Sequence, residues 1–483
     1  MPSGLRLSDG SVPRGRLVAT FGYTLNSMSG FFSNLLQSLQ GHRKDMRFLC
    51  HRLLSERGEA SQTAIAHEII TVYRSMRPED RPGFFEILSR EFSPDESAVR
   101  RAAVEYERAP SAHALAALSA AVEPPRQELI RRINTAPGGT ETLVTMRGHL
   151  LALRSDGANF EPLDSDLRHL FRSWFNRGFL RLERISVQTS AAILEKLIRY
   201  ESVHEINGWP DLLRRIQADR RCFAFFHPAL GDEPIIFVEV ALAKGLTGDL
   251  GPLLDVNAPV LRAERADTAI FYSINNCLQG LRNVPFGNFL IKQVVTELAA
   301  EFPNIKTYAT LSPLPLFSKA LRDSQNADGF TRDRLSRLLA EYSRSLTAAA
   351  GRRDPVDALF KLLERPFSHR DVLAEPLRRL ALAYLTRVRR DGKLYDPVAT
   401  FHLANGARLE RINSFGNLRP YGLSASFGVT VNYRYMPAEL EENHERFVRS
   451  GQIRVPSSLF HEHKAVAAAW EPGPPKSQHN KAR

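Results

Sequence analysis

One stretch of the sequence combines the residue types that bind phosphate groups. Residues 268–274 form an apolar run, residues 275–287 contain two glycines, and residues 288–302 repeat leucine and valine at helical spacing, which predicts a strand, a loop and a helix. Gly280 and Gly287 allow the loop backbone to point N–H groups at an anion, beside the positive end of the helix. The pattern predicts a pyrophosphate site, although a plain turn at Gly287 explains the spacing equally well.

A serine follows the next predicted strand. Residues 306–311 read as a strand, and it ends at Ser312, which is followed by Pro313 and then by Pro315. Because proline holds the residue before it in an extended conformation, this loop is stiff and aims the Ser312 hydroxyl in one direction. Ligand-facing groups commonly lie in such loops. Ser312 is therefore a candidate site residue, with a turn or a helix cap as the alternative.

A histidine lies further along the chain. Residues 398–403 alternate between the two faces of a predicted strand, and the dipeptide Asn405-Gly406 after them is typical of a hairpin turn. If Phe401 enters the core, His402 faces the opposite side of that strand. A histidine held there can transfer protons near neutral pH. A surface or cross-strand histidine is the alternative.

Composition restricts the kind of partner. The chain has 483 residues, of which 43% are hydrophobic and 24% charged, so it encodes folded domains rather than general disorder. Its 65 Lys and Arg against 53 Asp and Glu give a net charge of +12, which favours an anionic partner. The basic residues are spread along the chain without a basic arm or an aromatic-interleaved motif. A nucleotide or coenzyme A is therefore expected rather than nucleic acid.

Other sequence patterns limit the environment and the chemistry. The three cysteines are too few and too scattered for a disulfide framework or a CxxC metal site, which fits a reducing cytosol. No apolar run is long enough to span a bilayer, and residues 1–31 lack the continuous apolar segment of a signal peptide. The run His461-Glu462-His463 lacks the spacing of a zinc motif. We expect no metal, no membrane association and a cytoplasmic location.

The chain is predicted to divide into four regions. Residues 1–18 read as a flexible tail, and residues 19–177 carry apolar residues at helical spacing separated by Pro- and Gly-containing breaks. From residue 178 to 455 strands and helices alternate, with a helical insertion at about 320–390. Residues 456–483 end in proline and charged residues and are predicted to be a C-terminal tail.

Several short runs occur in order along the second half of the chain. They are Phe271-Tyr272-Ser273-Ile274, Gln279-Gly280-Leu281, Phe286-Gly287-Asn288-Phe289-Leu290-Ile291-Lys292, Leu311-Ser312-Pro313 and Phe401-His402-Leu403-Ala404-Asn405-Gly406-Ala407. These runs resemble the malonyl-CoA decarboxylase family, and the resemblance extends over about residues 163–435. It implies an α+β two-domain protein. An all-helical N-terminal bundle that mediates self-association is followed by a GCN5-related N-acetyltransferase-like mixed α/β catalytic domain with a helical insertion.

The resemblance also implies site residues. The catalytic serine of the family falls on Ser312 and the catalytic histidine on His402. The malonyl-CoA-binding loop falls on Arg282, Asn283, Val284, Pro285, Phe286, Gly287 and Asn288. Within this loop the chain has Asn283 and Pro285 where the animal enzymes carry Gly and Glu. The secondary candidates are Asn405, Tyr435 and Lys292.

The activity implied by the resemblance is decarboxylation of malonyl-CoA to acetyl-CoA and CO₂. His402 would protonate the enolate carbon, and Ser312 would orient the carboxylate or relay the proton. No cofactor is expected, because the thioester is the electron sink and coenzyme A is part of the substrate. The family also implies a homodimer or homotetramer. The terminus Lys481-Ala482-Arg483 differs from a peroxisomal signal, which favours a bacterial-type cytosolic enzyme.

Two alternatives share the predicted fold. An acyl-CoA-dependent N-acyltransferase would use the same phosphate loop but would form product only with an amine acceptor. A non-catalytic malonyl-CoA-binding regulator would bind the thioester without consuming it. An assay for acetyl-CoA without an acceptor separates the three hypotheses.

Overall fold

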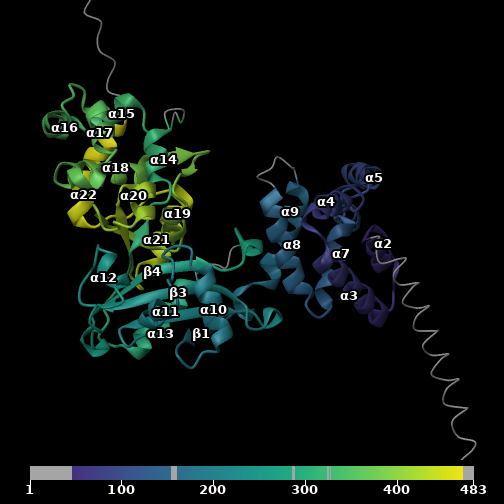
Figure 1. Cartoon of the computed structure of the whole chain (residues 1–483). Helices are drawn as coiled ribbons and strands as arrows, with labels where there is room; N and C mark the ends of the chain where they lie inside the picture. The colour runs from purple at the N-terminus through teal and green to yellow at the C-terminus, as the bar shows by residue number, and fades with distance from the viewer. Residues whose placement is uncertain (1–45, 154–159, 285–288, 324–325, 327, 472–483) are drawn as a thin grey trace, which may run out of the picture. The chain divides into compact units, whose positions relative to one another are not determined.

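The computed structural model describes residues 46–153, 160–284, 289–323, 326 and 328–471, and they form two compact units. The first unit extends to Leu170 and the second begins at Phe171 (Figure 1). The predicted order of a helical region followed by a mixed α/β region is confirmed. In the described residues no helix is long and apolar enough to cross a membrane.

The first unit is helical throughout its described part. Its helices are α2 (Met46–Ser55), α3 (Glu59–Ser75), α4 (Arg81–Arg90), α5 (Glu96–Arg108), α6 (Ala112–Val122), α7 (Pro125–Thr135) and α8 (Gly139–Leu153), with α9 (Glu161–Trp174) running into the second unit. Buried residues at helical spacing, such as Ile65 and Ile69 on α3, form its core. Asp95 caps α5 by accepting hydrogen bonds from two backbone N–H groups.

The second unit is built on a mixed sheet that has eight strands within the described residues. The strands are β1 (Arg181–Ile185), β2 (Arg220–Phe226), β3 (Pro234–Ala243), β4 (Thr268–Asn276), β5 (Thr307–Thr310), β6 (Ser312–Pro313), β9 (Arg408–Asn413) and β10 (Thr430–Tyr435). Their spatial order is β1-β2-β3-β4-β5-β10-β6, with β9 also paired to β10. The strands β2 and β3 pair antiparallel as a hairpin. In the same unit, α10 (Ala191–Tyr200) and α11 (Trp209–Arg215) contribute to an apolar core against β2 and β3.

The strands β4 and β5 run parallel and then separate. Their pairing ends at Phe271 and Thr310, whereas β4 continues to Asn276. Against β3, Val240 pairs with Phe271 and Glu239 with Ser273, so Tyr272 is an additional residue in β4, as in a β-bulge. The chain after β5 turns into β6, which pairs with β10. The divergence of β4 and β5 leaves space at the end of the sheet where Ser312 lies.

The remaining helices of the described residues complete the second unit. They are α12 (Gly251–Leu254), α13 (Phe289–Glu301), α14 (Phe317–Arg322), α15 (Arg332–Leu338), α16 (Ser343–Ala350), α17 (Pro355–Leu362), α18 (Arg370–Arg387), α19 (Pro397–Ala404), α20 (Pro420–Ser426), α21 (Leu440–Ser450) and α22 (Ser457–Trp470). A two-stranded ribbon of β7 (Arg389–Arg390) and β8 (Lys393–Leu394) precedes α19. The helices α14 to α18 lie in the predicted insertion between β6 and β9.

The predicted strand over residues 398–403 is wrong, because these residues lie in α19. Asp396 caps this helix by accepting a hydrogen bond from the Ala399 N–H at 2.7 Å, and Pro397 occupies its first turn. The dipeptide after it is therefore not a hairpin turn. Gly406 has φ +81°, and a Cβ there would lie 2.1 Å from the Leu440 carbonyl oxygen. The glycine permits close packing where the helix ends.

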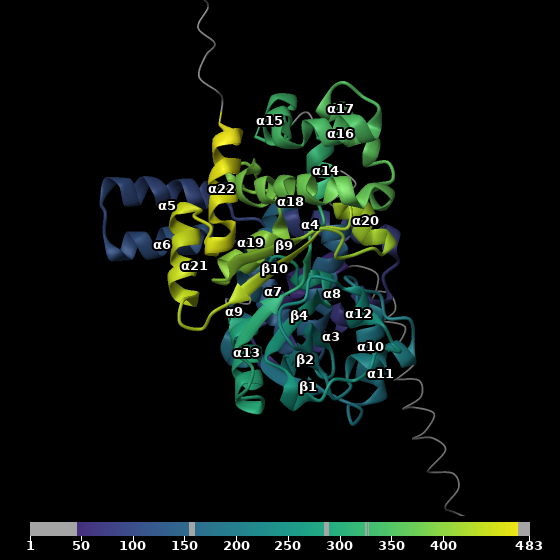
Figure 2. The ribbon, with the colours of Figure 1, turned by 90° about the vertical axis from the view of Figure 1, so that its left-hand side faces the viewer.

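The predicted C-terminal tail is also wrong over residues 457–470. These residues form α22, which packs against α15 and α18 (Figure 2). Its Leu459, Val466 and Trp470 are buried, and the guanidinium of Arg334 lies 4.6 Å from the Trp470 ring. This helix lacks a side-chain cap, so its start carries no local signal, and tertiary packing supplies its stability. Residues 472–483 lie outside the described residues.

Candidate active site

A cavity of about 560 Å³ opens where β4 and β5 diverge. Its lining comes from β3, β4, the loop after β4, α13, the start of β6 and α19, and it is mainly apolar. The polar side chains on its wall are Ser273, Asn276, Asn283, Ser312, Thr400, His402 and Asn405. An apolar cavity with a few convergent polar groups is typical of a ligand site.

Ser312 and His402 meet in this cavity. Ser312 Oγ lies 3.0 Å from His402 Nε2, although the two residues are 90 positions apart in the sequence. The start of β6 fixes Ser312, because Ser312 is paired with Val431 of β10. The capped helix α19 presents His402 from the other side. Both side chains are buried, with residue exposures of 5% and 3%.

The second nitrogen of His402 determines the tautomer. Nδ1 lies 2.7 Å from the hydroxyl of Tyr435, which is buried. Within the described residues this nitrogen is the acceptor available to the Tyr435 O–H, so the phenol donates to Nδ1 and the proton of the neutral imidazole is on Nε2. Nε2–H therefore donates to Ser312 Oγ, and the Ser312 hydroxyl donates to Thr310 Oγ1 at 2.9 Å. A serine in this arrangement is not deprotonated by the histidine.

Burial also sets the charge of the histidine. Removal from water lowers the pKa of His402 to about 3, because the cationic form loses its hydration. The ring of Tyr433 stacks on the imidazole with centroids 4.7 Å apart. In the free protein the imidazole is neutral at pH 7 and is held between aromatic rings in a single orientation.

The residues of the predicted substrate loop have different positions. Asn283 and Val284 line the cavity, and Asn283 has a left-handed φ of +61°. Arg282 is exposed and lies outside the cavity lining. The other four predicted positions, Pro285, Phe286, Gly287 and Asn288, lie outside the described residues.

The secondary candidates Asn405, Tyr435 and Lys292 also differ in their position relative to the cavity. Asn405 lines the cavity, and its amide donates to the Phe401 carbonyl at 2.6 Å. Tyr435 lies behind His402 and contacts it directly. Lys292 forms an ion pair with Glu441 of α21 and is not part of the cavity lining.

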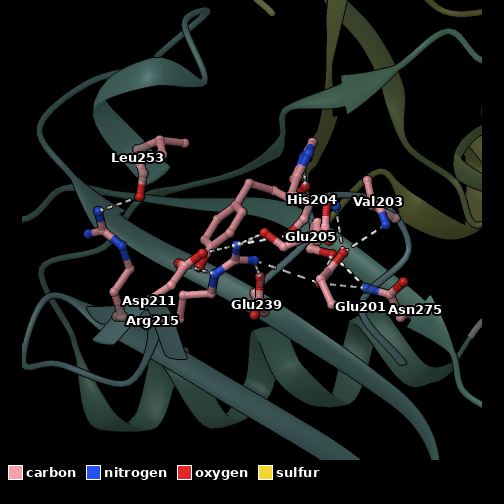
Figure 3. Close-up of polar contacts among 12 residues, drawn as sticks. Glu201, Val203, His204, Glu205, Asp211, Arg215, Glu239, Leu253 and Asn275 are labelled. Atoms are coloured by element: carbon pink, nitrogen blue, oxygen red, sulfur yellow. Dashed lines mark hydrogen bonds and ion pairs between the residues drawn. The ribbon is translucent and has the colours of Figure 1, made fainter. Parts of the chain in front are cut away.

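Sequence reasoning missed the polar network behind β4. Ser273 and Asn275 alternate with apolar residues on β4, and both bond to the buried carboxylate of Glu201 (Figure 3). Val203, two residues after Glu201, lines the cavity. Two polar residues two positions apart in an otherwise apolar strand are the sequence signal for such a network.

Comparisons with known proteins cover both regions of the chain. Residues 178–471 match the family model described as the malonyl-CoA decarboxylase C-terminal domain, and residues 92–175 match the one described as the N-terminal domain. The mitochondrial malonyl-CoA decarboxylase of Anser anser anser is 35% identical over 348 residues, covering 70% of this chain and 69% of that protein. That of Rattus norvegicus is 32% identical over 352 residues, covering 70% and 71%.

Solved structures are similar over more of the chain. The crystal structure of malonyl-CoA decarboxylase from Rhodopseudomonas palustris has a TM-score of 0.76 at 43% identity, covering 87% of this chain and 99% of that one. The structure from Agrobacterium vitis also has a TM-score of 0.76, at 40% identity, and covers 89% and 100%.

Proposed function

Since the chain belongs to the malonyl-CoA decarboxylase family, it converts malonyl-CoA to acetyl-CoA and CO₂, and we propose that Ser312 and His402 carry out the proton chemistry. The observation that carries this assignment is the 3.0 Å contact between Ser312 Oγ and His402 Nε2 in the cavity. Both side chains are buried, so their hydrogen bonds act in surroundings of low dielectric.

The reaction needs a donor for an oxyanion and a proton for carbon. When the bond between the carboxylate and the α-carbon breaks, its electron pair moves through the carbon to the thioester oxygen, and CO₂ leaves. The enolate then takes up one proton at the α-carbon to give acetyl-CoA. Donors placed at the developing oxyanion stabilise this path, and a positioned acid accelerates it about 10²–10⁴-fold.

We assign the proton transfer to His402. A malonyl carboxylate in the cavity would raise the pKa of His402, because a nearby negative charge favours the imidazolium. The proton that charges the imidazole comes from solvent, and in the imidazolium the Tyr435 oxygen accepts from Nδ1–H. After CO₂ leaves, the Nε2 proton passes to carbon, and the neutral imidazole keeps the proton on Nδ1. Ser312 orients the carboxylate or relays the proton, and Asn405 or a backbone N–H of β4 completes the oxyanion site. This scheme uses no metal and no cofactor besides the substrate's own coenzyme A.

We assign coenzyme A binding to the segment after β4 and the start of α13. Asn283 and Val284 place this segment at the cavity, and Arg282 supplies positive charge beside it. We also assign coenzyme A binding to residues 285–288. Lys292 would have to share its ammonium between Glu441 and a phosphate.

The substitution His402→Ala tests the assignment. We expect the rate of acetyl-CoA formation from malonyl-CoA to fall at least about 100-fold, because the proton donor is lost, while coenzyme A affinity is retained. Initial rates and calorimetric binding of coenzyme A measure the two quantities. His461→Ala, on the exposed side of α22, is the matched control. Near wild-type turnover in His402→Ala would show that the histidine is not the proton donor.

We further propose that the helical unit mediates self-association and that the enzyme acts in the cytoplasm. The described helices α5 and α6 bury few residues: none of α5 is buried, and in α6 only Ala114 is buried. Leu115 and Val122 of α6 are 48% and 47% exposed, which supports an interface with a second copy. All three cysteines are free, which supports a reducing compartment.

A further inference from the structure

A buried carboxylate away from Ser312 and His402 holds one wall of the cavity. Glu201 follows α10 directly, and its residue exposure is 6%. Its Oε1 accepts hydrogen bonds from the backbone N–H groups of Val203 at 2.8 Å and His204 at 2.7 Å. Its Oε2 accepts from Ser273 Oγ at 2.7 Å. The same oxygen accepts from Asn275 Nδ2 at 2.8 Å (Figure 3). One carboxylate thus joins the segment after α10 to β4.

The directions of these bonds suit a carboxylate. All four partners of Glu201 donate, and a carboxylate is the side chain that accepts on both oxygens. The orientation of the Asn275 amide is fixed by Ser202. Asn275 Oδ1 accepts from the backbone N–H of Ser202 at 3.0 Å and from the Ser202 hydroxyl at 2.9 Å. An amide in place of Glu201 would therefore set an N–H group against another donor.

Arg215 of α11 holds the same segment through its carbonyl groups. Its Nη2 donates to the carbonyl oxygens of His204 at 2.8 Å and Glu205 at 3.1 Å. Asp211 and Glu239 hold the guanidinium itself, each at 2.9 Å (Figure 3). The segment after α10 is thus fixed from its N–H side by Glu201 and from its carbonyl side by Arg215.

His204 connects the segment to the bulge in β4. Its Nε2 lies 3.1 Å from the carbonyl oxygen of Tyr272, the additional residue of that strand. Because a carbonyl only accepts, Nε2 carries the proton and donates. The network therefore reaches the part of β4 that lines the cavity, where Tyr272 and Ser273 lie on the same wall as Val203.

Stability alone does not account for this arrangement. The carboxyl groups of Glu201, Asp211 and Glu239 surround the guanidinium of Arg215 in the interior. Burying ions costs desolvation energy, and apolar residues of similar volume are frequently at least as stabilising. The charged network holds the segment after α10 in a single position, because each hydrogen bond of the network has a fixed direction.

We propose that Glu201 is a positioning residue for the decarboxylation. Its carboxylate fixes Val203 and Ser273 on the cavity wall and so holds the acyl end of the substrate in line with Ser312 and His402. The inference rests on the proposed function of the cavity. The coenzyme A end is held by other residues, so loss of Glu201 affects the chemical step more than binding.

The test is Glu201→Gln in the full chain. We expect kcat for malonyl-CoA to fall about 10- to 100-fold, as for a displacement of about 1 Å at the reacting centre, while KM changes less than about threefold. Asp219→Asn is the matched control, because Asp219 is equally buried, pairs with Arg214 at 2.7 Å and lies outside the cavity lining. This control should lower the melting temperature and leave kcat within about twofold.

A second variant covers the case in which Glu201→Gln does not fold. Val203→Ala keeps every bond of the network and shortens only the wall residue, so it should lower kcat with little change in melting temperature. The positioning role is overturned if Glu201→Gln melts lower but keeps wild-type kcat, or if Val203→Ala leaves kcat unchanged. Failure of the proposed function is separate, because His402→Ala would then keep its turnover.

Discussion

The 2.7 Å hydrogen bond from the Tyr435 hydroxyl decides which nitrogen of His402 carries a proton. Without it, Nδ1 and Nε2 compete for the proton and the ring loses a fixed partner. We expect Tyr435→Phe to lower kcat about tenfold, which corresponds to the loss of one such bond, with little change in KM. Steady-state kinetics at several pH values measure this effect.

The neighbouring aromatic residue provides the control for that substitution. Tyr433→Phe keeps the ring that stacks on His402, so kcat should stay within about twofold of wild type. If kcat falls equally in the two variants, the tyrosines act through packing and do not set the tautomer of His402.

Sequence reasoning at the residue scale was most informative where chemistry and backbone restriction coincide. The prolines after Ser312 made it a candidate, with a turn or a helix cap as the alternative, and the family resemblance then selected it. The structure places it against His402. Glu201 was missed because its side-chain partners Ser273 and Asn275 lie on β4, more than seventy residues away in sequence. A lone glutamate after a helix carries no local sign that it will be buried.

At the element scale, strand β3 carries a carboxyl whose ionisation affects folding. Burial raises the pKa of Glu239 from its usual 4.5 to about 8, against the opposing effect of Arg215. The folded protein therefore binds this proton more tightly than the unfolded chain. Its contribution to stability is complete below about pH 4.5 and is lost as pH rises through about 8.

Glu239→Gln tests this dependence while preserving shape. An amide oxygen still accepts the hydrogen bond from Arg215 but does not titrate, so the variant should lose less stability than wild type between pH 6 and about pH 9. Denaturant unfolding at the two pH values gives the difference for each protein. Parallel losses in both would assign the pH dependence to other groups.

The strands and helices differed in how far local sequence predicted them. The hairpin of β2 and β3 has a clear local signal, because two apolar runs flank a turn. Residues 398–403 were misread because their alternation is short, whereas the cap at Asp396 and Pro397 decides in favour of a helix. Helix α22 depends on contacts with α15 and α18, and no local pattern reveals those.

At the scale of the whole molecule, the exposed apolar face of α6 bears on assembly. We expect Leu115→Glu combined with Val122→Glu to shift the protein to a smaller species, because charges in an apolar interface remain unpaired. Light scattering coupled to size-exclusion chromatography measures the mass. Leu213→Glu, at a similarly exposed position on α11, is the control. An unchanged mass in the double variant would show that α6 is not the interface.

The order of the two regions followed from the sequence because residues 19–177 carry helical spacing, whereas strand patterns begin only from residue 178. The resemblance of the short runs to one family then supplied the activity. The cavity could not be predicted from the sequence, because it depends on where β4 and β5 separate and on the one-residue bulge at Tyr272.

Strand β10 pairs with the chain on both sides of the helical insertion: with β5 and β6 before it, and with β9 after it. A backbone cut at Gly351, between α16 and α17, would leave Ser312 on one fragment and both His402 and Tyr435 on the other. Neither piece alone would hold all the residues proposed to act in the reaction. Turnover by such a divided enzyme would report that the two pieces have reassembled.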